Sequence, residues 1–286
     1  MMISKGENNQ MDLNRYSSIE NIFFTITTIT YVISMILYFI FFVSKKDVLG
    51  RWASVLLLIG FAFHTASLIT RGVGAGRVPL ANQYEFAVSF AWGISLCFIV
   101  VERRYSFKAL GAFVLPVVFI IMGYAAMQSK DIRPLMPALQ SSWLTIHVST
   151  AVISYGSFGV SFALSCMYML KSYFKGEFYE KQIPSLDKLD FLTYRVITFG
   201  YLFLTLVIIT GAIWAERAWS RYWAWDPKET WSLITWIIYS AYLHVRLMKG
   251  WKGKNAALFA IVGFICVIFT YIGVNTLLPS VHSYVR

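Results

Sequence analysis

Residues 22–43 have the sequence IFFTITTITYVISMILYFIFFV, an unbroken run of uncharged and mainly apolar side chains. Because a helix rises about 1.5 Å per residue, about 20 such residues cross the hydrocarbon core of a bilayer. Seven more stretches of this kind follow along the chain. We expect spans at residues 22–43, 52–70, 86–101, 109–127, 142–170, 194–214, 230–248 and 256–274. The sequence therefore predicts an all-α, polytopic membrane protein with about eight transmembrane helices.

The composition of the chain supports this class of protein. Of its 286 residues, 58% are hydrophobic and only 14% are charged, whereas a soluble domain carries about 25% charged residues. The net charge of +11 would indicate a nucleic-acid partner in a soluble protein. In a membrane protein it indicates Lys and Arg at the cytoplasmic surface, so we expect no nucleic-acid partner. The connections between spans are short, so we expect one integral membrane domain over residues 1–286.

The distribution of Lys and Arg predicts the orientation in the membrane. With the N-terminus outside, the inner segments lie around residues 45–51, 103–108, 171–195 and 246–254, and they hold 15 of the 25 Lys and Arg. This arrangement satisfies the positive-inside rule and the opposite one violates it. We therefore expect both termini and the loop at residues 215–229 to lie outside. The polar N-terminal segment does not resemble a transit peptide, so we expect a bacterial plasma membrane, with a thylakoid membrane less favoured.

Six of the ten tryptophans fall within residues 214–236, which we call the tryptophan segment: WAERAWSRYWAWDPKETWSLITW. It comprises an outer loop and the start of the seventh predicted span. An aromatic belt at the lipid headgroups is the structural alternative, but it needs only about one or two such residues per helix end. A flat apolar surface ringed by cations suits a planar ligand that carries carboxylates, as haem does. We therefore favour a ligand platform, with these candidate residues: Trp214, Trp219, Trp223, Trp225 and Trp231.

Asp226, Pro227 and Glu229 have the spacing of a capping box with proline in the first helical turn. We expect Asp226 and Glu229 to start the next helix and not to act as catalytic acids. In this position Asp226 contributes to the ligand site by making the platform rigid.

The chain has four histidines, and the predicted topology separates them. His147 lies near the outer end of the fifth span and His282 follows the eighth, so both share a face with the tryptophan segment. Two such imidazoles can ligate a haem iron from its two sides, although unrelated hydrogen-bonding roles stay open. His244 lies roughly 20 Å and His64 roughly 9 Å below the outer surface. This difference in depth disfavours a haem whose iron is ligated by both His244 and His64. The second ligand that would pair with His244 is therefore not identified.

These residues resemble the CcsA/ResC family of cytochrome c biogenesis proteins, the membrane subunits of the two-component cytochrome c synthase. The tryptophan-rich WWD signature of that family resembles YWAWDPKETWSLITW at residues 222–236. Further matching stretches are PLANQYE (79–85), WLTIHVSTAVISYG (143–156) and GVN…HSY (273–284). The resemblance runs from about residue 60 to the C-terminus, and its four segments match in order.

The resemblance implies a set of roles for this chain. His147 and His282 would ligate the iron of haem b on the outer side of the membrane, against the WWD loop. His244 would belong to a second haem site within the membrane, completed by a CcsB/ResB-type partner subunit. The haem would pass across the membrane and be joined by thioether bonds to the CxxCH motif of apocytochrome c, a second partner. The chain would thus be a subunit of a cytochrome c synthase, or haem lyase, and no catalytic residue is assigned.

Two other functions compete with this interpretation. A WWD protein that resembles CcmC would deliver haem to a chaperone, but the eight predicted spans and WDPKETW favour the synthase subunit. A non-haem transporter or quinone-site protein would use the aromatic residues for its substrate. The spans lack the paired interrupted helices of inverted-repeat carriers, which disfavours the transporter.

Overall fold

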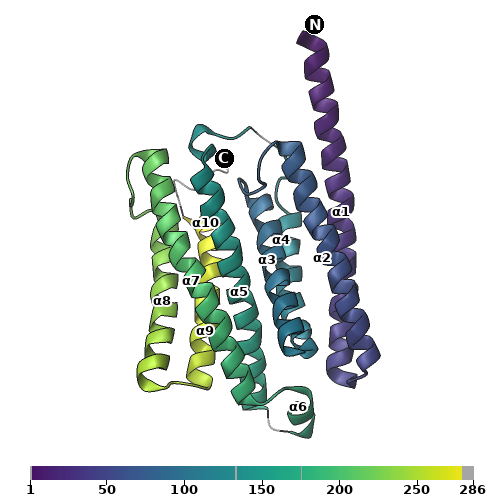
Figure 1. Cartoon of the computed structure of the whole chain (residues 1–286), viewed down its shortest axis with the longest axis vertical. Helices are drawn as coiled ribbons and strands as arrows, with labels where there is room; N and C mark the ends of the chain where they lie inside the picture. Colours follow the sequence, from purple (N-terminus) through teal and green to yellow (C-terminus); the bar gives the residue numbers. More distant parts are fainter. Residues whose placement is uncertain (1, 133, 175, 279–286) are drawn as a thin grey trace.

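The computed structural model of the chain describes residues 2–132, 134–174 and 176–278, with side chains from residue 14 onward except at residue 138. Every regular element in these residues is helical (Figure 1). The long helices are α1 (Met2–Ser44), α2 (Asp47–Ala75), α3 (Gln83–Tyr105), α4 (Gly111–Ala126), α5 (Ser142–Tyr173), α7 (Leu186–Trp219), α8 (Pro227–Lys249) and α9 (Lys254–Ile268). The short ones are η1 (Lys108–Leu110), η2 (Pro137–Leu139), α6 (Glu177–Gln182), the π-helix η3 (Phe269–Gly273) and α10 (Val274–Leu277).

The predicted class, an all-α polytopic membrane protein, is confirmed. In the described residues, seven helical stretches are long and apolar enough to cross a membrane: Asn14–Ser44, Asp47–Ala75, Gln83–Tyr105, Lys108–Ala126, Ser142–Tyr173, Leu186–Trp219 and Lys254–Leu277. The eighth long helix, α8, has 23 residues and so is about 34 Å long, enough to cross a hydrocarbon core of about 30 Å. It falls outside the seven because of its composition, since charged and polar residues such as Lys228, Glu229, His244 and Arg246 interrupt its apolar surface.

The helices form one bundle, with α1 and α2 at one edge and α7 and α8 at the other (Figure 1). Helix α5 lies in the middle and packs against α3, α7 and α9. Glycines allow α3 and α5 to touch through their backbones: a Cβ added at Gly156 would lie 2.5 Å from the carbonyl carbon of Gly93. Such close packing through small residues holds helices together in lipid, where apolar burial alone does not.

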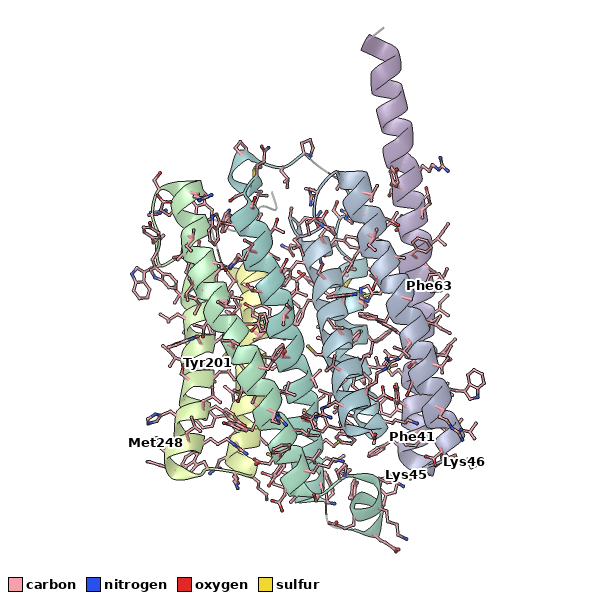
Figure 2. All side chains as sticks on the ribbon, viewed as in Figure 1. Phe41, Lys45, Lys46, Phe63, Tyr201 and Met248 are labelled. Carbon is pink, nitrogen blue, oxygen red and sulfur yellow. The ribbon has the colours of Figure 1, made fainter. Side chains whose placement is uncertain are left out.

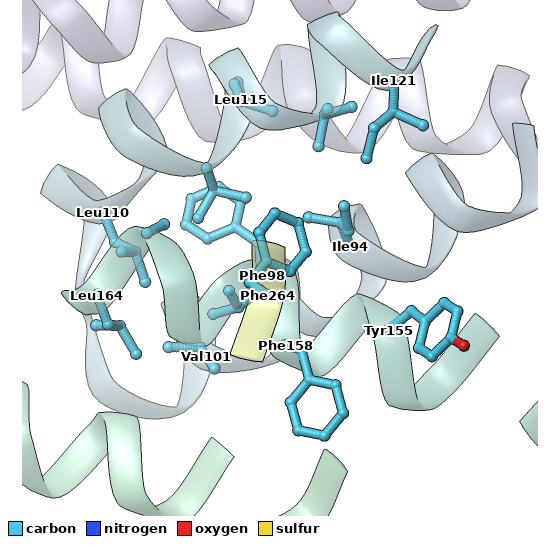
Figure 3. Close-up of a cluster of buried hydrophobic side chains, with 14 of the residues drawn as sticks. Ile94, Phe98, Val101, Leu110, Leu115, Ile121, Tyr155, Phe158, Leu164 and Phe264 are labelled. Carbon is cyan, nitrogen blue, oxygen red and sulfur yellow. The ribbon is translucent and has the colours of Figure 1, made fainter. Parts of the chain in front are cut away.

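Between these helices lies a core of buried side chains. Figure 3 shows Phe98 of α3, Leu115 of α4 and Phe158 of α5 lying together in it. The ring of Phe158 also stacks on Tyr239 of α8, with ring centroids 3.8 Å apart. This contact attaches α8 to the bundle, although only three of its residues are buried (Thr235, Tyr239 and Tyr242).

The two ends of the bundle differ in character. The connections at residues 76–82, 127–132, 134–141 and 220–226 lie at one end, which we call the tryptophan end. The connections at residues 45–46, 176–185 and 250–253 lie at the opposite end, the basic end, where Figure 2 shows Lys45, Lys46 and Met248. The four basic segments identified in the sequence all lie at this second end. That the tryptophan end faces outward stays a prediction of the positive-inside rule.

A network of buried ion pairs joins the helices at the tryptophan end. The guanidinium of Arg71, whose side chain is 1% exposed, lies 3.2 Å from a carboxylate oxygen of Glu20 and 3.0 Å from one of Glu85. Arg77 pairs with Glu85 at 2.7 Å, and Arg71 also donates to the carbonyl of Lys130. Buried charges are tolerated when they are paired in this way. The network fixes α1, α2, α3 and the segment after α4 relative to one another, and thereby positions residues 79–85.

Candidate functional site

A cavity opens at the tryptophan end, between α3, α5, α7, α8 and the α9–α10 region. Its empty volume is ≈ 1270 Å³, which includes the part open to solvent. The walls are mainly apolar and include Phe86 of α3, Leu144 and Val148 of α5, and Val207 and Ile208 of α7.

His147 lies in the α5 wall of this cavity, near the start of the helix, which Ser141 caps. Its Nδ1 atom is 2.9 Å from the carbonyl oxygen of Val207. A carbonyl only accepts hydrogen bonds, so Nδ1 carries the proton and the lone pair of the neutral ring is on Nε2. Metal-binding histidines are commonly held in this way, with the second ring nitrogen donating to a carbonyl. In this tautomer Nε2 carries the lone pair through which a neutral imidazole can ligate a metal.

Two neighbours on α7 fit the ring of His147 closely. A Cβ added at Gly211 would lie 2.8 Å from Cε1 of His147, so only glycine leaves room for the ring in this orientation. The indole of Trp214 stacks nearly parallel to the imidazole, at 6.1 Å between ring centroids and 16° between planes. Both residues therefore help to fix the direction in which the imidazole points.

The five candidate tryptophans occupy different environments. Trp214 and Trp223 line the cavity, and Trp219 packs edge-on against Trp214 with ring centroids 4.8 Å apart. Trp214 is 2% exposed and belongs to a small core cluster with Leu139, Leu144 and Val148. Trp225 is 68% exposed, and the ring of Trp231 packs on that of Phe269 with centroids 4.2 Å apart; neither residue lines the cavity. The structure thus brings only two of the five indoles to the cavity.

Trp223 has a further property that bears on ligand binding. Its indole Nε1 is buried, and it has no hydrogen-bond partner in the described part of the chain. A buried indole N–H usually finds an acceptor. A ligand with an oxygen acceptor in this cavity would satisfy it.

Asp226 and Glu229 form the capping box expected from the sequence. The carboxylate of Asp226 accepts from the backbone N–H of Lys228 at 3.0 Å. Glu229 Oε2 accepts from the N–H groups of Asp226 and Ala224, at 3.2 and 2.7 Å. These bonds hold the loop before α8 against the cavity, so the two acids have structural roles, as predicted.

Part of the cavity wall is formed by a π-helix, which the sequence did not predict. Thr270 and Tyr271 of η3 and Asn275 of α10 line the cavity. The hydroxyl of Tyr271 donates to the carbonyl of Gln83 at 2.7 Å, which joins this region to the start of α3. An inserted π-turn redirects side chains and is frequent at functional sites. An unbroken apolar run at residues 256–274 gives no signal for it.

Two of the other histidines, His244 and His64, lie away from the cavity wall that His147 lines. His244 is exposed on α8, twelve residues beyond the cavity residue Ser232, which is about 18 Å along the helix. His64 is fully buried, with Tyr31 Oη 3.2 Å from its Nδ1 and the Val88 carbonyl oxygen 3.0 Å from its Nε2. These bonds give His64 a structural role between α1, α2 and α3. His282 lies outside the described residues.

Fold and site together define a polytopic helical membrane protein with an oriented imidazole in the wall of an apolar cavity beside a tryptophan-rich loop. The chain belongs to the family described as "Cytochrome C assembly protein", whose model matches residues 80–282. The family resemblance inferred from the sequence is therefore confirmed, and the chain has a role in cytochrome c maturation.

Individual relatives agree with this assignment. The chain is 36% identical to the cytochrome c biogenesis protein CcsA of Guillardia theta, over 97% of this chain and 98% of that protein. It is 38% identical to CcsA of Synechococcus sp. (strain CC9605), over 82% of this chain and 88% of the relative.

The fold is also similar to a solved structure, that of the cytochrome c haem lyase CcmF. The TM-score is 0.72 at 16% identity, and the match covers 93% of this chain and 47% of CcmF. The chain thus spans just under half the length of CcmF. At this level of identity the similarity shows a shared fold.

Proposed function

We propose that the chain binds haem b in the cavity at the tryptophan end and presents it for covalent attachment to apocytochrome c. The observation that carries this proposal is the placement of His147, whose Nδ1 proton is held by the Val207 carbonyl at 2.9 Å while the ring lies in the cavity wall. A fixed neutral imidazole is a common axial ligand of haem iron. His282 is the proposed second ligand, from the sequence alone.

The cavity suits the rest of the haem molecule. Its mainly apolar walls favour the porphyrin ring, and the ring of Trp214 holds the imidazole from one side. The buried Nε1 of Trp223 can donate to a ligand oxygen, such as one of a haem propionate. A large aliphatic substrate would also pack well on the apolar walls. It would neither be ligated by the imidazole of His147 nor accept a hydrogen bond from the indole of Trp223.

In this proposal His244 belongs to a second haem site, which is completed by a CcsB/ResB-type subunit. His244 is exposed on α8, an edge helix of the bundle with few buried residues. A polar side chain that faces lipid is costly, and such residues commonly mark a functional contact. A partner subunit packed on this face would cover the imidazole and supply the second ligand.

In the proposed sequence of events, haem first binds at the site of His244, towards the basic end, and then reaches the cavity. The membrane is a bacterial plasma membrane. Apocytochrome c docks at the cavity, and the histidine of its CxxCH motif replaces one axial ligand. Each thiol then adds across one vinyl group: sulfur bonds to the carbon next to the ring and the proton goes to the terminal carbon. The addition consumes no oxidant or reductant, so the protein contributes position and orientation. The chain acts as a subunit of a cytochrome c synthase.

The CcsA relatives support this role over that of a CcmC-like delivery protein.

A substitution that fills the cavity tests the proposed binding of haem there. Ala212 lines the cavity on α7, so Ala212→Phe would occupy part of the space for the ring. Ala126 is exposed at the end of α4, and Ala126→Phe is the matched control. We expect Ala212→Phe to lower both the haem copurified with the chain and its partner and the yield of holocytochrome c. Wild-type haem content and yield in Ala212→Phe would contradict the proposal.

A further inference from the structure

A second hollow opens at the basic end, between the α1–α2 connection, the end of α3, η1 and the segment from α6 to the start of α7 (Figure 1). We call it the basic hollow, and its empty volume is ≈ 2040 Å³, which includes the part open to solvent. Two hydrogen bonds fix its α6 wall to the end of α1. Lys45 Nζ donates to the carbonyl oxygen of Gln182 at 2.8 Å, and the side-chain amide of Gln182 donates to the carbonyl oxygen of Val43 at 3.0 Å. The hollow is therefore part of the folded structure.

The basic hollow has an excess of positive charge. The described residues that line it include six Lys and Arg and three Asp and Glu. Lys171 pairs with Glu180 at 2.8 Å. Lys181 pairs with Glu177, which lies outside the lining. The other four cations have no carboxylate partner in the part of the chain that the structure describes: Lys45, Arg103, Lys108 and Lys188.

The acidic residues of the lining offset only part of this charge. Glu102 is 7% exposed, and its carboxylate accepts from the hydroxyl of Tyr38 at 2.7 Å and from that of Ser54. Asp47 is the first residue of α2, where the N-terminus of the helix stabilises a negative charge. With six cations against three acids, the lining keeps an excess of three positive charges. An anion would bind here with charge-assisted hydrogen bonds.

The lining changes from charged to apolar along α2. Val55 and Leu58 also line the hollow, eight and eleven residues after Asp47, which is about 12 and 17 Å further along the helix. Val55 is 42% exposed, although it lies in a helix that is apolar enough to cross a membrane. A small anion such as free phosphate would use only the charged part of this lining. A phospholipid would use both parts, since its phosphate lies at the membrane surface and its acyl chains lie below.

An unpaired acceptor in the lining indicates the kind of headgroup. Gln182 lines the hollow and is 8% exposed. Because the carbonyl of Val43 only accepts hydrogen bonds, the amide nitrogen of Gln182 faces it, and this fixes the orientation of the amide. Its Oε1 is buried without a hydrogen-bond partner among the described residues, whereas buried polar atoms normally have one. A hydroxyl group of the ligand would supply the donor.

We infer that the basic hollow binds an anionic phospholipid whose headgroup carries a hydroxyl, of the phosphatidylglycerol type. The phosphate binds to the cations without carboxylate partners, and the headgroup hydroxyl donates to Oε1 of Gln182. An acyl chain packs on Val55 and Leu58. The bound lipid reduces the repulsion among the cations and joins α2, the end of α3 and the α6 wall. The inference does not depend on haem binding at the tryptophan end.

Native mass spectrometry of the purified chain in detergent tests this inference, because it resolves the first lipid bound to each molecule. The chain is titrated with dioleoyl phosphatidylglycerol and with dioleoyl phosphatidylcholine, which has neither net charge nor a hydroxyl. Dioleoyl phosphatidylmethanol keeps the charge and lacks the hydroxyl. The double variant Arg103→Met/Lys188→Met removes two cations of the hollow. Arg104→Met/Lys249→Met is the matched control, because it removes two exposed cations of the basic end that do not line the hollow.

We expect wild type to bind phosphatidylglycerol more tightly than phosphatidylcholine by about tenfold or more, with phosphatidylmethanol between them. Arg103→Met/Lys188→Met should lose most of this preference and the control variant should keep it. A wild-type chain without the preference would overturn the inference, even if the double variant failed to fold. A full preference in Arg103→Met/Lys188→Met would also overturn it. Equal binding of phosphatidylmethanol and phosphatidylglycerol would overturn the contact with Gln182. Displacement of the bound lipid by millimolar inorganic phosphate would show a site for free phosphate and overturn the lipid assignment.

Discussion

The imidazole of His147 donates from Nδ1 to the carbonyl oxygen of Val207 across the α5–α7 interface, at 2.9 Å. The bond fixes the tautomer of the ring and turns it into the wall of the cavity. Val207 lies twelve residues before Trp219, the last residue of α7, so the helical hydrogen bonds of α7 also use its carbonyl. A carbonyl oxygen has two lone pairs and can accept both bonds. The geometry of this site is therefore a property of two packed helices.

Gly211→Ala tests whether this orientation matters. The added methyl group would lie 2.8 Å from Cε1 of His147, so the ring must turn away and its Nε2 must leave its present position. We expect a haem titration, followed by the Soret absorbance, to show weaker haem binding, by about tenfold or more, since the cost of overpacking is about 1–3 kcal/mol. Gly123→Ala is the matched control, because its Cβ would meet no atom within 4 Å. Equal affinity in both variants would show that the ring orientation is unimportant.

The capping box before α8 is expected to order the loop beside the cavity. Glu229→Ala removes the acceptor of the N–H groups of Ala224 and Asp226, and loss of a helix cap costs about 1 kcal/mol. Hydrogen–deuterium exchange at residues 220–226 should become faster by about fivefold. Glu177→Ala is the control, since its carboxylate is exposed and pairs with Lys181 at the basic end. Unchanged exchange in Glu229→Ala would show that other contacts hold the loop.

The ion-pair network at the tryptophan end should be a major source of stability. Arg71→Met leaves Glu20 buried without its cation, and breaking one side of a buried pair costs about 3–5 kcal/mol. We expect a clearly lower unfolding temperature in detergent micelles. Arg104 is exposed at the basic end of α3, so Arg104→Met should change stability by less than about 0.5 kcal/mol. Similar unfolding temperatures for the two variants would contradict this view of the network.

We expect His244 to be required for haem binding at the second site of the complex and not for haem binding in the cavity. In the complex with the CcsB/ResB-type subunit, His244→Ala should lose the haem of the second site and keep the haem of the cavity, as measured by the pyridine haemochrome content. Leu247→Ala changes an exposed side chain on the same helix and should keep both. Loss of all haem from His244→Ala would show that the sites are not independent. A wild-type haem content in His244→Ala would show that His244 is not a haem ligand.

Much of the fold could be predicted from the sequence, because a membrane span leaves a strong signal in composition alone. The run at residues 22–43 lies within a helix that ends at Ser44, and the Asp-Pro-x-Glu pattern marks the start of α8. The sequence signal for a membrane span is weaker in α8 than in the other long helices. Its length fits a span, whereas its exposed His244 and its charged ends reduce its hydropathy. In the proposed complex, the partner subunit would cover this face of α8.

The candidate site could be predicted only in part. His147 and Trp214 stood out as residues of rare type, and the structure brings them together. The sequence does not show that Val207 accepts the imidazole proton or that Gly211 makes space for the ring, because both depend on how α5 packs on α7. Nor does it show that Trp225 and Trp231 are absent from the cavity lining, since clustering along the chain does not specify where each side chain lies.

Reduced visible spectra of the purified complex test the central claim most directly, with wild type compared with His147→Ala and His282→Ala. The account predicts bands of haem ligated by two histidines in wild type. Both substitutions should weaken or shift these bands, and added imidazole should restore them. Wild-type complex without haem, or haem bands indifferent to both substitutions, would contradict haem ligation in this cavity and return the tryptophan segment to a role at the membrane interface.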